Sequence, residues 1–411
     1  MPVKNRKQIL SWCLFDFANS SYSAVIASVI FPVYYATRIV GNQSGAGDLW
    51  WGRAVSLSMA FVALTSPFLG GIADFGGIRK RLLIAYTLIC VCAVAMLSFI
   101  HRGMTAEGFF LIVLANIGME GGLVFYNSFL PEISEPEYQG RISAWGYALG
   151  YAGSVAALVM AFPLIKKGNF GLTWITVSVF FIVFSMPAFL FLPSDREKGL
   201  GMVRAASKGL KYTWSTVGEI WRKKETRLFL LAYLIFEDGV NTVIVFSSIF
   251  AATTLGFTPG ELIILYIVVQ VTALAGAFLA ARPIDFQGPK KIVVLSLVMW
   301  TSVSVIAYFV GSKTHFWVLA CIAGLGLGTV QAAARAFFAQ FIPPECESAY
   351  FGVYSMVGKT SAIFGPLLFG YISSTFGSQR PAILSVASFF LIGLVIIQFV
   401  RGGRPNIKAS S

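Results

Sequence analysis

The sequence predicts an all-α membrane protein with twelve transmembrane helices in two pseudo-symmetric six-helix bundles. The 411-residue chain is 57% apolar and only 12% charged, whereas an average soluble domain carries about 25% charged residues. Twelve apolar runs are long enough to cross a bilayer, which takes roughly 20 helical residues. A charged motif also occurs once in each half of the chain.

The charged motif marks a turn shared by the two halves. Its pattern is Asp-Phe-x-Gly-x-basic-Lys, and its copies cover residues 74–80 and 285–291, about half the chain length apart. A repeat at this distance indicates two similar halves rather than a solenoid of short units. Glycine permits a sharp backbone path, and basic residues hold such a turn on the cytoplasmic side.

The expected spans form two groups of six. Those of the first half cover about 9–38, 50–73, 81–101, 107–131, 140–165 and 170–192. Those of the second half cover about 228–254, 260–282, 290–311, 315–342, 350–376 and 380–400. We therefore predict an N-terminal bundle over 1–192, a cytoplasmic linker over 193–227 and a C-terminal bundle over 228–411.

Basic residues are distributed unevenly among the loops. If the N-terminus is cytoplasmic, roughly three basic residues fall in cytoplasmic segments for each one near an outer helix end, and this bias predicts that both termini are cytoplasmic. The linker places Val203, Leu210, Trp214, Val217 and Trp221 on one helical face. This pattern predicts an amphipathic helix, which either lies on the inner membrane surface or packs as a soluble linker on the two halves.

Ionisable residues inside the spans recur on every third helix. Asp16 lies in the first span, Glu120 in the fourth, Glu237 and Asp238 in the seventh, and Arg335 in the tenth. The third, sixth, ninth and twelfth spans carry no interior charge. A charge inside a bilayer is costly and faces a cavity or a partner. We expect the charged spans to line a polar pathway and the uncharged spans to face lipid.

Several stretches resemble one family of transporters. They are Phe15–Ser20, Asn127–Ile133, Gly140–Tyr147, Phe236–Val240, Phe341–Glu345 and the run from Phe351-Gly352 through Gly358-Lys359 to Gly365-Pro366. With the paired turns, they resemble the major facilitator superfamily and, within it, the autophagy-related protein 22-like family of fungal vacuolar amino-acid effluxers and bacterial transporters. The resemblance implies the two-bundle fold and a transport role. One departure is Arg282-Pro283, which stands where the first copy has Gly71-Ile72.

Polar side chains of the first span form a stripe. Asp16, Asn19 and Ser23 lie at i, i+3 and i+7 on one helical face. The stripe either lines the transport pathway or caps a kinked helix start. Tyr22 lies beside it and is a further candidate for substrate contact.

A second polar face occurs on the fourth span, where Asn116, Glu120 and Asn127 align. Glu120 lies near mid-span, where desolvation favours the protonated carboxyl unless a cation pairs with it. Glu120 is therefore either a proton carrier or half of a permanent ion pair, and Asn127 is a candidate contact.

The second half contributes adjacent acids and one arginine. Glu237 and Asp238 point about 100° apart on a helix, and Asn241 lies one turn beyond Glu237. Arg335, with Gln331 one turn earlier, is the strongest counter-charge because a guanidinium binds a carboxylate bidentately. It contacts either a substrate carboxylate or one of these two acids.

Lys359 in the eleventh span either binds an anion or pairs with Asp16 or Glu120 when the inner gate closes. The residues of the two charged turns are expected to stabilise one gate conformation rather than to contact substrate. They are Asp74, Gly77, Arg79, Lys80, Arg81, Asp285, Gly288, Lys290 and Lys291.

Other chemistry has little support. His101 and His315 are isolated, and the five cysteines show no zinc or disulfide spacing. We expect no enzyme activity, metal, cofactor or nucleic-acid partner. We expect a monomeric secondary active transporter in contact with membrane lipid, in a bacterial inner membrane. By resemblance, its substrate is a small polar solute, with proton-coupled amino-acid efflux first; transport of another metabolite or drug, or a non-transporting receptor or scaffold, are the alternatives.

Overall fold

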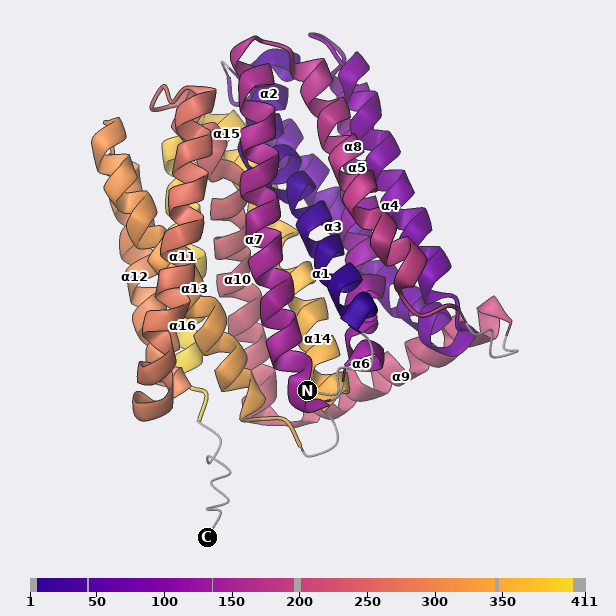
Figure 1. The fold of residues 1–411 in the computed structure, drawn as a ribbon. Coiled ribbons are helices and arrows are strands. Elements are labelled where there is room, and N and C mark those ends of the chain that lie inside the picture. The colour runs from indigo at the N-terminus through magenta and orange to yellow at the C-terminus, as the bar shows by residue number, and fades with distance from the viewer. Residues whose placement is uncertain (1–5, 43, 135, 196–200, 344–346, 402–411) are drawn as a thin grey trace.

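Long helices that run side by side make up the fold (Figure 1). The computed structural model describes residues 6–42, 44–134, 136–195, 201–343 and 347–401, and these contain no strand. Helices from the first part of the chain gather on one side of the bundle and those from the last part on the other. The all-α membrane fold expected from the sequence is confirmed.

The first part of the chain contributes α1 (Arg6–Ser21), η1 (Tyr22–Val29), α2 (Phe31–Tyr34), η2 (Tyr35–Val40), α3 (Ala46–Gly76), α4 (Arg79–Met96), η3 (Leu97–Phe99), α5 (Thr105–Ser128), α6 (Leu130–Ile133), α7 (Pro136–Lys166) and α8 (Phe170–Phe191). The rest contributes α9 (Met202–Arg222), α10 (Lys224–Thr253), α11 (Pro259–Gln287), α12 (Pro289–Phe309), α13 (Lys313–Ala339), α14 (Glu347–Thr360), α15 (Phe364–Phe376) and α16 (Gln379–Gln398).

The eleventh expected span is a broken helix. Within the described ranges, 11 helical segments are long and apolar enough to cross a membrane, and the expected span at 350–376 is instead divided into α14 and α15. Two missing donors explain the break. The Gly365 N–H points to a side chain of α10, and Pro366 has no N–H to offer. Within the described residues, long apolar helices therefore match every expected span except the eleventh, which consists of two shorter helices.

The first span is continuous from Arg6 to Val40 but is not a uniform α-helix. In η1 and η2 the turns widen to the π form, in which each N–H reaches the carbonyl five residues earlier. Such turns are frequent at functional sites. Here η1 carries Tyr22, Ser23 and Ser28, and all three recur in the site described below.

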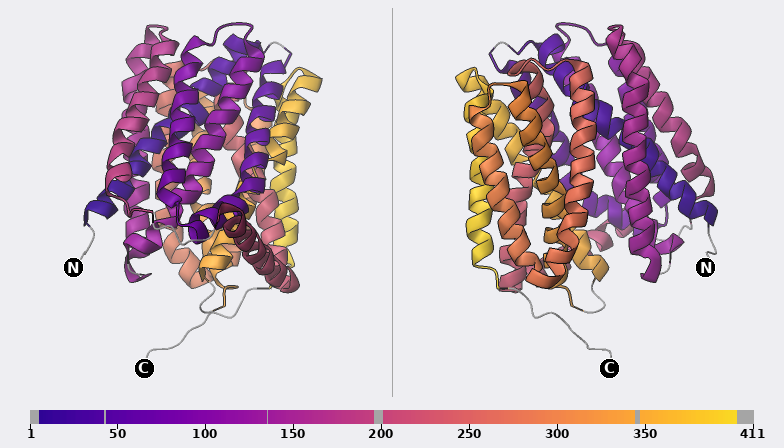
Figure 2. Two further views of the ribbon diagram at one scale, coloured as in Figure 1. Left: turned by 90° about the vertical axis from the view of Figure 1, so that its right-hand side faces the viewer. Right: turned by 60° about the vertical axis from the view of Figure 1, so that its left-hand side comes forward.

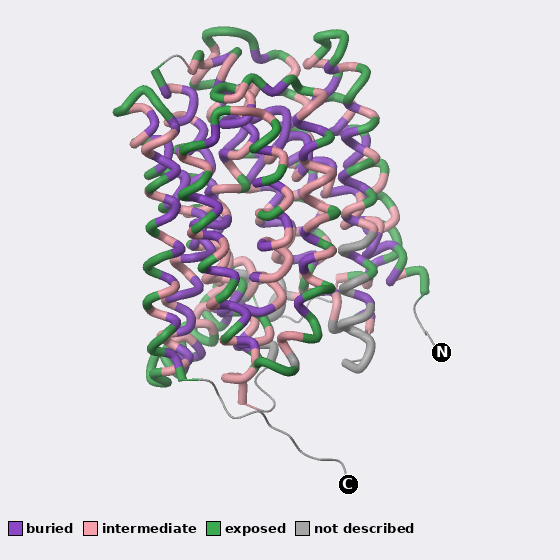
Figure 3. Tube along the Cα trace, turned by 90° about the vertical axis from the view of Figure 1, so that its left-hand side faces the viewer, coloured by how far each residue is buried: buried purple, intermediate pink, exposed green. Residues whose placement is uncertain are grey.

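The two ends of the bundle differ. Helix α9 lies across the end at which α1 begins and α16 finishes (Figures 1 and 2), and we call this the inner end. Between the two ends, α3 packs along α15 and α7 packs against α11, so these pairs join the two sides of the molecule. Buried and exposed stretches alternate along the peripheral helices (Figure 3). On α12, for example, Leu295, Val298 and Phe309 are exposed, as expected for a face in lipid.

Candidate functional site

An ion pair joins the two sides of the molecule near the middle of the bundle. The Lys359 Nζ lies 2.9 Å from Oε2 of Glu120 and also donates to the Glu120 carbonyl at 3.0 Å. Glu120 belongs to α5, and Lys359 occupies the last turn of α14, next to the helix break. Both side chains are largely but not fully buried, at 27% and 17% exposed. This pairing is one of those expected for Lys359.

Helix α10 holds the break between α14 and α15 in place. Both carboxylate oxygens of Asp238 accept the Gly365 N–H, at 2.8 and 2.9 Å, and the Asn241 amide donates to the Ser361 hydroxyl at 3.0 Å. A carboxylate at a helix N-terminus satisfies an N–H that has no partner in its own helix. A Cβ on Gly365 would lie 2.6 Å from Oδ1 of Asp238, so only glycine permits this approach.

Glu237 has an incomplete set of partners. Its Oε1 accepts from the Gln331 amide at 2.7 Å, while its buried Oε2 has no hydrogen-bond partner within the described part of the chain. The expected ion pair of Arg335 with Glu237 or Asp238 does not occur among the described residues. Glu237 accepts a hydrogen bond from the Gln331 amide, and Asp238 accepts one from the Gly365 N–H. Arg335 lies one turn from Gln331 and near enough to Tyr233 for their charges to interact.

The first-half candidates divide into separate contacts. On α1, the Asn19 amide donates to Asp16 at 3.3 Å. On η1, the buried Tyr22 hydroxyl donates to Asn116 at 2.6 Å, which fixes the widened helix against α5. Asn127 is exposed at the end of α5, so Asn116 and Asn127 lie in different environments despite their shared helical face.

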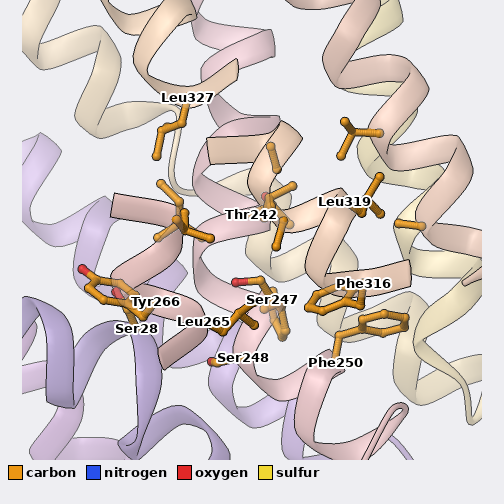
Figure 4. Close-up of a pocket in the computed structure, with 18 of the residues that line it drawn as sticks. Ser28, Thr242, Ser247, Ser248, Phe250, Leu265, Tyr266, Phe316, Leu319 and Leu327 are labelled. Atoms are coloured by element: carbon orange, nitrogen blue, oxygen red, sulfur yellow. The ribbon is translucent and has the colours of Figure 1, made fainter. Parts of the chain in front are cut away.

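A cavity of about 420 Å³ lies beside these groups, towards the outer end. Its walls are mainly apolar and come from α10, α11, α12, α13 and α16, and η1 reaches it with Ser23 and Ser28. Figure 4 shows Ser28 beside Tyr266, where helices of the two sides meet. Two of its lining groups, the Ser248 hydroxyl and the Trp300 indole N–H, have no hydrogen-bond partner among the residues that the structure describes.

A buried polar cluster lies at the outer end. Asp48, in the first turn of α3, is 0% exposed. It accepts from Asn42 at 3.0 Å, Ser373 at 2.5 Å and Gln379 at 2.9 Å. The hydroxyls of Thr253 and Thr254, at the end of α10, donate to the side-chain carbonyl oxygen of Gln379. The cluster thus ties α3 to α15, α16 and α10, and no pattern in the sequence predicts it.

The two charged turns share one backbone feature. Gly77 has φ 72° and Gly288 has φ 87°, a left-handed conformation that favours glycine. Beyond each turn a lysine binds free carbonyls at the end of a neighbouring helix. Lys80 donates to Leu192 at 2.8 Å and Leu190 at 3.3 Å.

In the second turn this role moves by one residue. Lys290 donates to Val400 at 2.7 Å and Gln398 at 3.0 Å, although the motif aligns Lys290 with Arg79. Lys291, which aligns with Lys80, is exposed.

The first turn makes further contacts. Arg79 donates to Glu132 and to the Ser128 carbonyl, both at 3.1 Å. Asp195 accepts from the backbone N–H of Lys80 at 2.8 Å and of Arg81 at 3.1 Å, which caps α4. The side chains of Asp74 and Asp285 lie outside the described residues.

Comparison with known proteins identifies the family. Residues 53–409 match the family described as vacuole effluxer Atg22 like. The chain belongs to this family. An uncharacterized MFS-type transporter of Bacillus subtilis (strain 168), YxiO, is 29% identical over 97% of this chain and 96% of its own length. Autophagy-related protein 22-1 of Penicillium rubens is 23% identical and covers 86% of this chain and 75% of its own.

Solved structures agree with this assignment at the level of fold. The nucleoside transporter NupG superimposes with a TM-score of 0.70 at 13% identity, covering 95% of this chain and 98% of that one. A bacterial homologue of the human lysosomal transporter Spinster, inward-facing and occupied, gives 0.67 at 13% identity, covering 96% and 95%. The Atg22-like chain is therefore a membrane-embedded transporter of the major facilitator type, not an enzyme, and its substrate is a small molecule.

The Atg22-like site contains no metal-binding cluster of three or more His, Cys, Asp or Glu side chains within the described ranges. Sequence reasoning missed two of its parts. The Asp48 cluster lies at the edge of an expected span. A carboxylate at this position cannot be distinguished by sequence from an ordinary loop residue. The cavity is lined by hydroxyl and apolar groups, and its only sequence signal was the Ser247-Ser248 pair in an apolar run.

Proposed function

We propose that this Atg22-like protein exports a small polar solute by alternating access, with an amino acid as the first candidate and protons as the coupling ions. The Glu120–Lys359 ion pair is the observation that carries this proposal. It joins α5 to α14 across the two sides of the bundle, so it must break when the sides separate. Because the pair lies beside the helix break, it would act as a latch, which here means an ion pair that stabilises one conformation and must break before the other forms.

The groups around Glu237 suit a zwitterion. A buried carboxylate oxygen without a partner is costly, and a ligand ammonium would supply both charge and donors. Arg335 lies one turn from Gln331 on α13, and a guanidinium can bind a ligand carboxylate bidentately. Glu237 and Arg335 would then bind the two ends of an amino acid, with Gln331 orienting Glu237.

Alternating access needs closures at both ends. The Asp48 cluster supplies an outer closure, since it holds α3 against α15 and α16. The charged turns would act at the inner end, where Arg79 and Lys80 fix the ends of α5 and α8. Glu120 is the proposed proton carrier, because its protonation would release Lys359 and open the latch.

Orientation and assembly are part of the same proposal. We place the protein as a monomer in a bacterial inner membrane, with both termini and α9 on the cytoplasmic side. The bias of basic residues towards these segments supports this orientation. A cysteine at Ser207 should resist an impermeant thiol reagent in intact cells, and ready labelling would reverse the orientation.

Counterflow in proteoliposomes tests the function. Vesicles loaded with an unlabelled amino acid should take up the labelled form, and Glu237→Gln should weaken apparent affinity about 10-fold or more, since a hydrogen bond to a charged group contributes about 1.5–3 kcal/mol. Glu107→Gln, which changes an exposed acid outside this cluster, is the matched control. No counterflow with any amino acid would refute this substrate class.

The apolar walls of the cavity favour one alternative, a lipophilic metabolite or drug. Such a solute would show counterflow while amino acids did not, and Ser248→Ala or Trp300→Phe would alter its affinity more than Glu237→Gln. A folded protein that binds a solute without any counterflow would instead be a receptor or scaffold.

A further inference from the structure

The exposed surface of α9 carries two stripes that the transport proposal does not use. Ala205, Thr216 and Ile220 are buried on the face that packs on the bundle, mainly against α3. About 140° around the helix from the centre of this face, Val203, Trp214 and Trp221 are 84%, 62% and 52% exposed. Their spacings of eleven and seven residues place them on one line along the helix. The apolar arc of α9 is therefore wider than the surface that the bundle covers.

A basic stripe follows the apolar one around the helix. Arg204, Lys211 and Arg222 are exposed and share a second line, about 80–100° from the tryptophans. The one acid of α9 is Glu219, and it is occupied by Lys223 at 2.8 Å and Tyr350 at 2.9 Å. These contacts lower the pKa of Glu219, so it stays ionised and bound to its own partners rather than to the basic stripe.

An apolar stripe beside a basic stripe is the arrangement of an interfacial helix. Around α9 the two stripes lie about 90° apart, and each lies about 130–140° from the centre of the bundle contact. Helix α9 lies across the inner end of the bundle (Figure 2), so in a bilayer the two stripes would lie at the level of the headgroups, with the apolar stripe towards the acyl chains. Tryptophan favours that boundary, and lysine and arginine are attracted to anionic headgroups.

We propose that α9 is an interfacial anchor that binds anionic phospholipid through Arg204, Lys211 and Arg222, with Val203, Trp214 and Trp221 inserted at the level of the headgroups. The charge complementarity selects the lipid, since three exposed cations face no acid of the same helix. Interfacial helices with this arrangement bind more strongly as the content of anionic lipid rises. The proposal does not depend on which solute is transported.

Lipid retention by the full-length protein tests the charge. Purified protein in neutral detergent is mixed with phosphatidylglycerol and phosphatidylcholine, and bound lipid is counted by native mass spectrometry. Phosphatidylglycerol should be retained preferentially, and Arg204→Gln/Lys211→Gln/Arg222→Gln should lower that preference at least fivefold, since one basic residue near an anionic surface contributes roughly fivefold. Arg102→Gln/Lys166→Gln/Lys167→Gln removes three exposed charges elsewhere and should leave the preference unchanged. Equal losses in the two triple variants, or none in either, would overturn the proposal.

Tryptophan quenching tests the depth. In vesicles that contain brominated phosphatidylglycerol, wild-type fluorescence should be quenched more than that of Trp214→Phe/Trp221→Phe. The difference should shrink when the bromine is carried by phosphatidylcholine in the same mixture. If inorganic phosphate displaced the lipid in the first assay and the two tryptophans were not quenched, the site would bind a soluble anion instead, and the anchor would be ruled out.

Discussion

The ammonium of Lys359 lies 2.9 Å from the carboxylate of Glu120, although 239 positions separate the two residues. The backbone of Lys359 is held in α14, and its ammonium is held by a carboxylate of α5. Removing one partner leaves a partly desolvated charge, whereas removing both leaves none. This difference gives the first prediction.

Lys359→Gln should lower thermal stability in detergent more than Glu120→Gln/Lys359→Gln does. Breaking a fully buried pair from one side costs roughly 3–5 kcal/mol, and we expect about half of that here because both side chains retain some exposure. Thermal unfolding of the single and double variants measures the coupling. Additive losses would mean that the two residues contribute independently.

Glu120→Gln separates proton coupling from solute exchange. If Glu120 carries the proton, its neutral amide should abolish uphill flux driven by a pH gradient but retain counterflow, which needs no net proton movement. Both assays can use one preparation of proteoliposomes. Uphill flux at the wild-type rate would remove Glu120 as the carrier and leave Asp16, Glu237 and Asp238 to be tested.

Asp238→Ala should destabilise the protein, because Asp238 caps α15 at the Gly365 N–H and alanine has no acceptor to replace it. Loss of a helix cap costs about 0.5–2 kcal/mol. Glu237→Gln should leave unfolding nearly unchanged, since Oε2 of Glu237 makes no hydrogen bond within the described part of the chain that would be lost. The Asp238 variant should therefore lose more stability, and Glu237→Gln should lose more solute affinity. Equal loss of stability in the two variants would contradict these roles.

Asp48→Asn should open the outer end. The new amide would place N–H donors against those of Gln379 and Asn42, so the cluster loses hydrogen bonds that nothing replaces. A cysteine at Ser247, in the wall of the cavity, should then react faster with a reagent added from outside. Glu107→Gln, at an exposed acid, provides the control, and an unchanged rate in Asp48→Asn would show that the cluster does not close the pathway.

Gly77→Ala and Gly288→Ala should each destabilise the protein by about 1–2 kcal/mol, because both glycines have positive φ and a Cβ is disfavoured there. Gly218→Ala is the control, since a Cβ on this helical glycine meets open space and should be neutral or slightly stabilising. Thermal unfolding of the three variants compares them. A loss at only one turn would show that the two copies are not equivalent.

Much of the fold follows from sequence patterns that are local. Apolar runs and the two glycine turns depend on neighbours in the chain, and their positions could be predicted. The pairing of Glu120 with Lys359 was within reach, because each is a lone charge in a span. The Asp48 cluster was not, since it gathers residues from four separate helices. The contact of Asp238 with Gly365 was also hidden, because it depends on a break in a span that reads as continuous.

The break in the eleventh span has a mechanical consequence. Helix α14 is attached to α5 through Lys359, whereas α15 is attached to α10 through Asp238 and to α3 through Ser373. Since no continuous ladder of backbone hydrogen bonds joins the two pieces, α14 can tilt without carrying α15 along. A perturbation at Lys359 should thus act first on access from the inner end, and one at Ser373 first on access from the outer end.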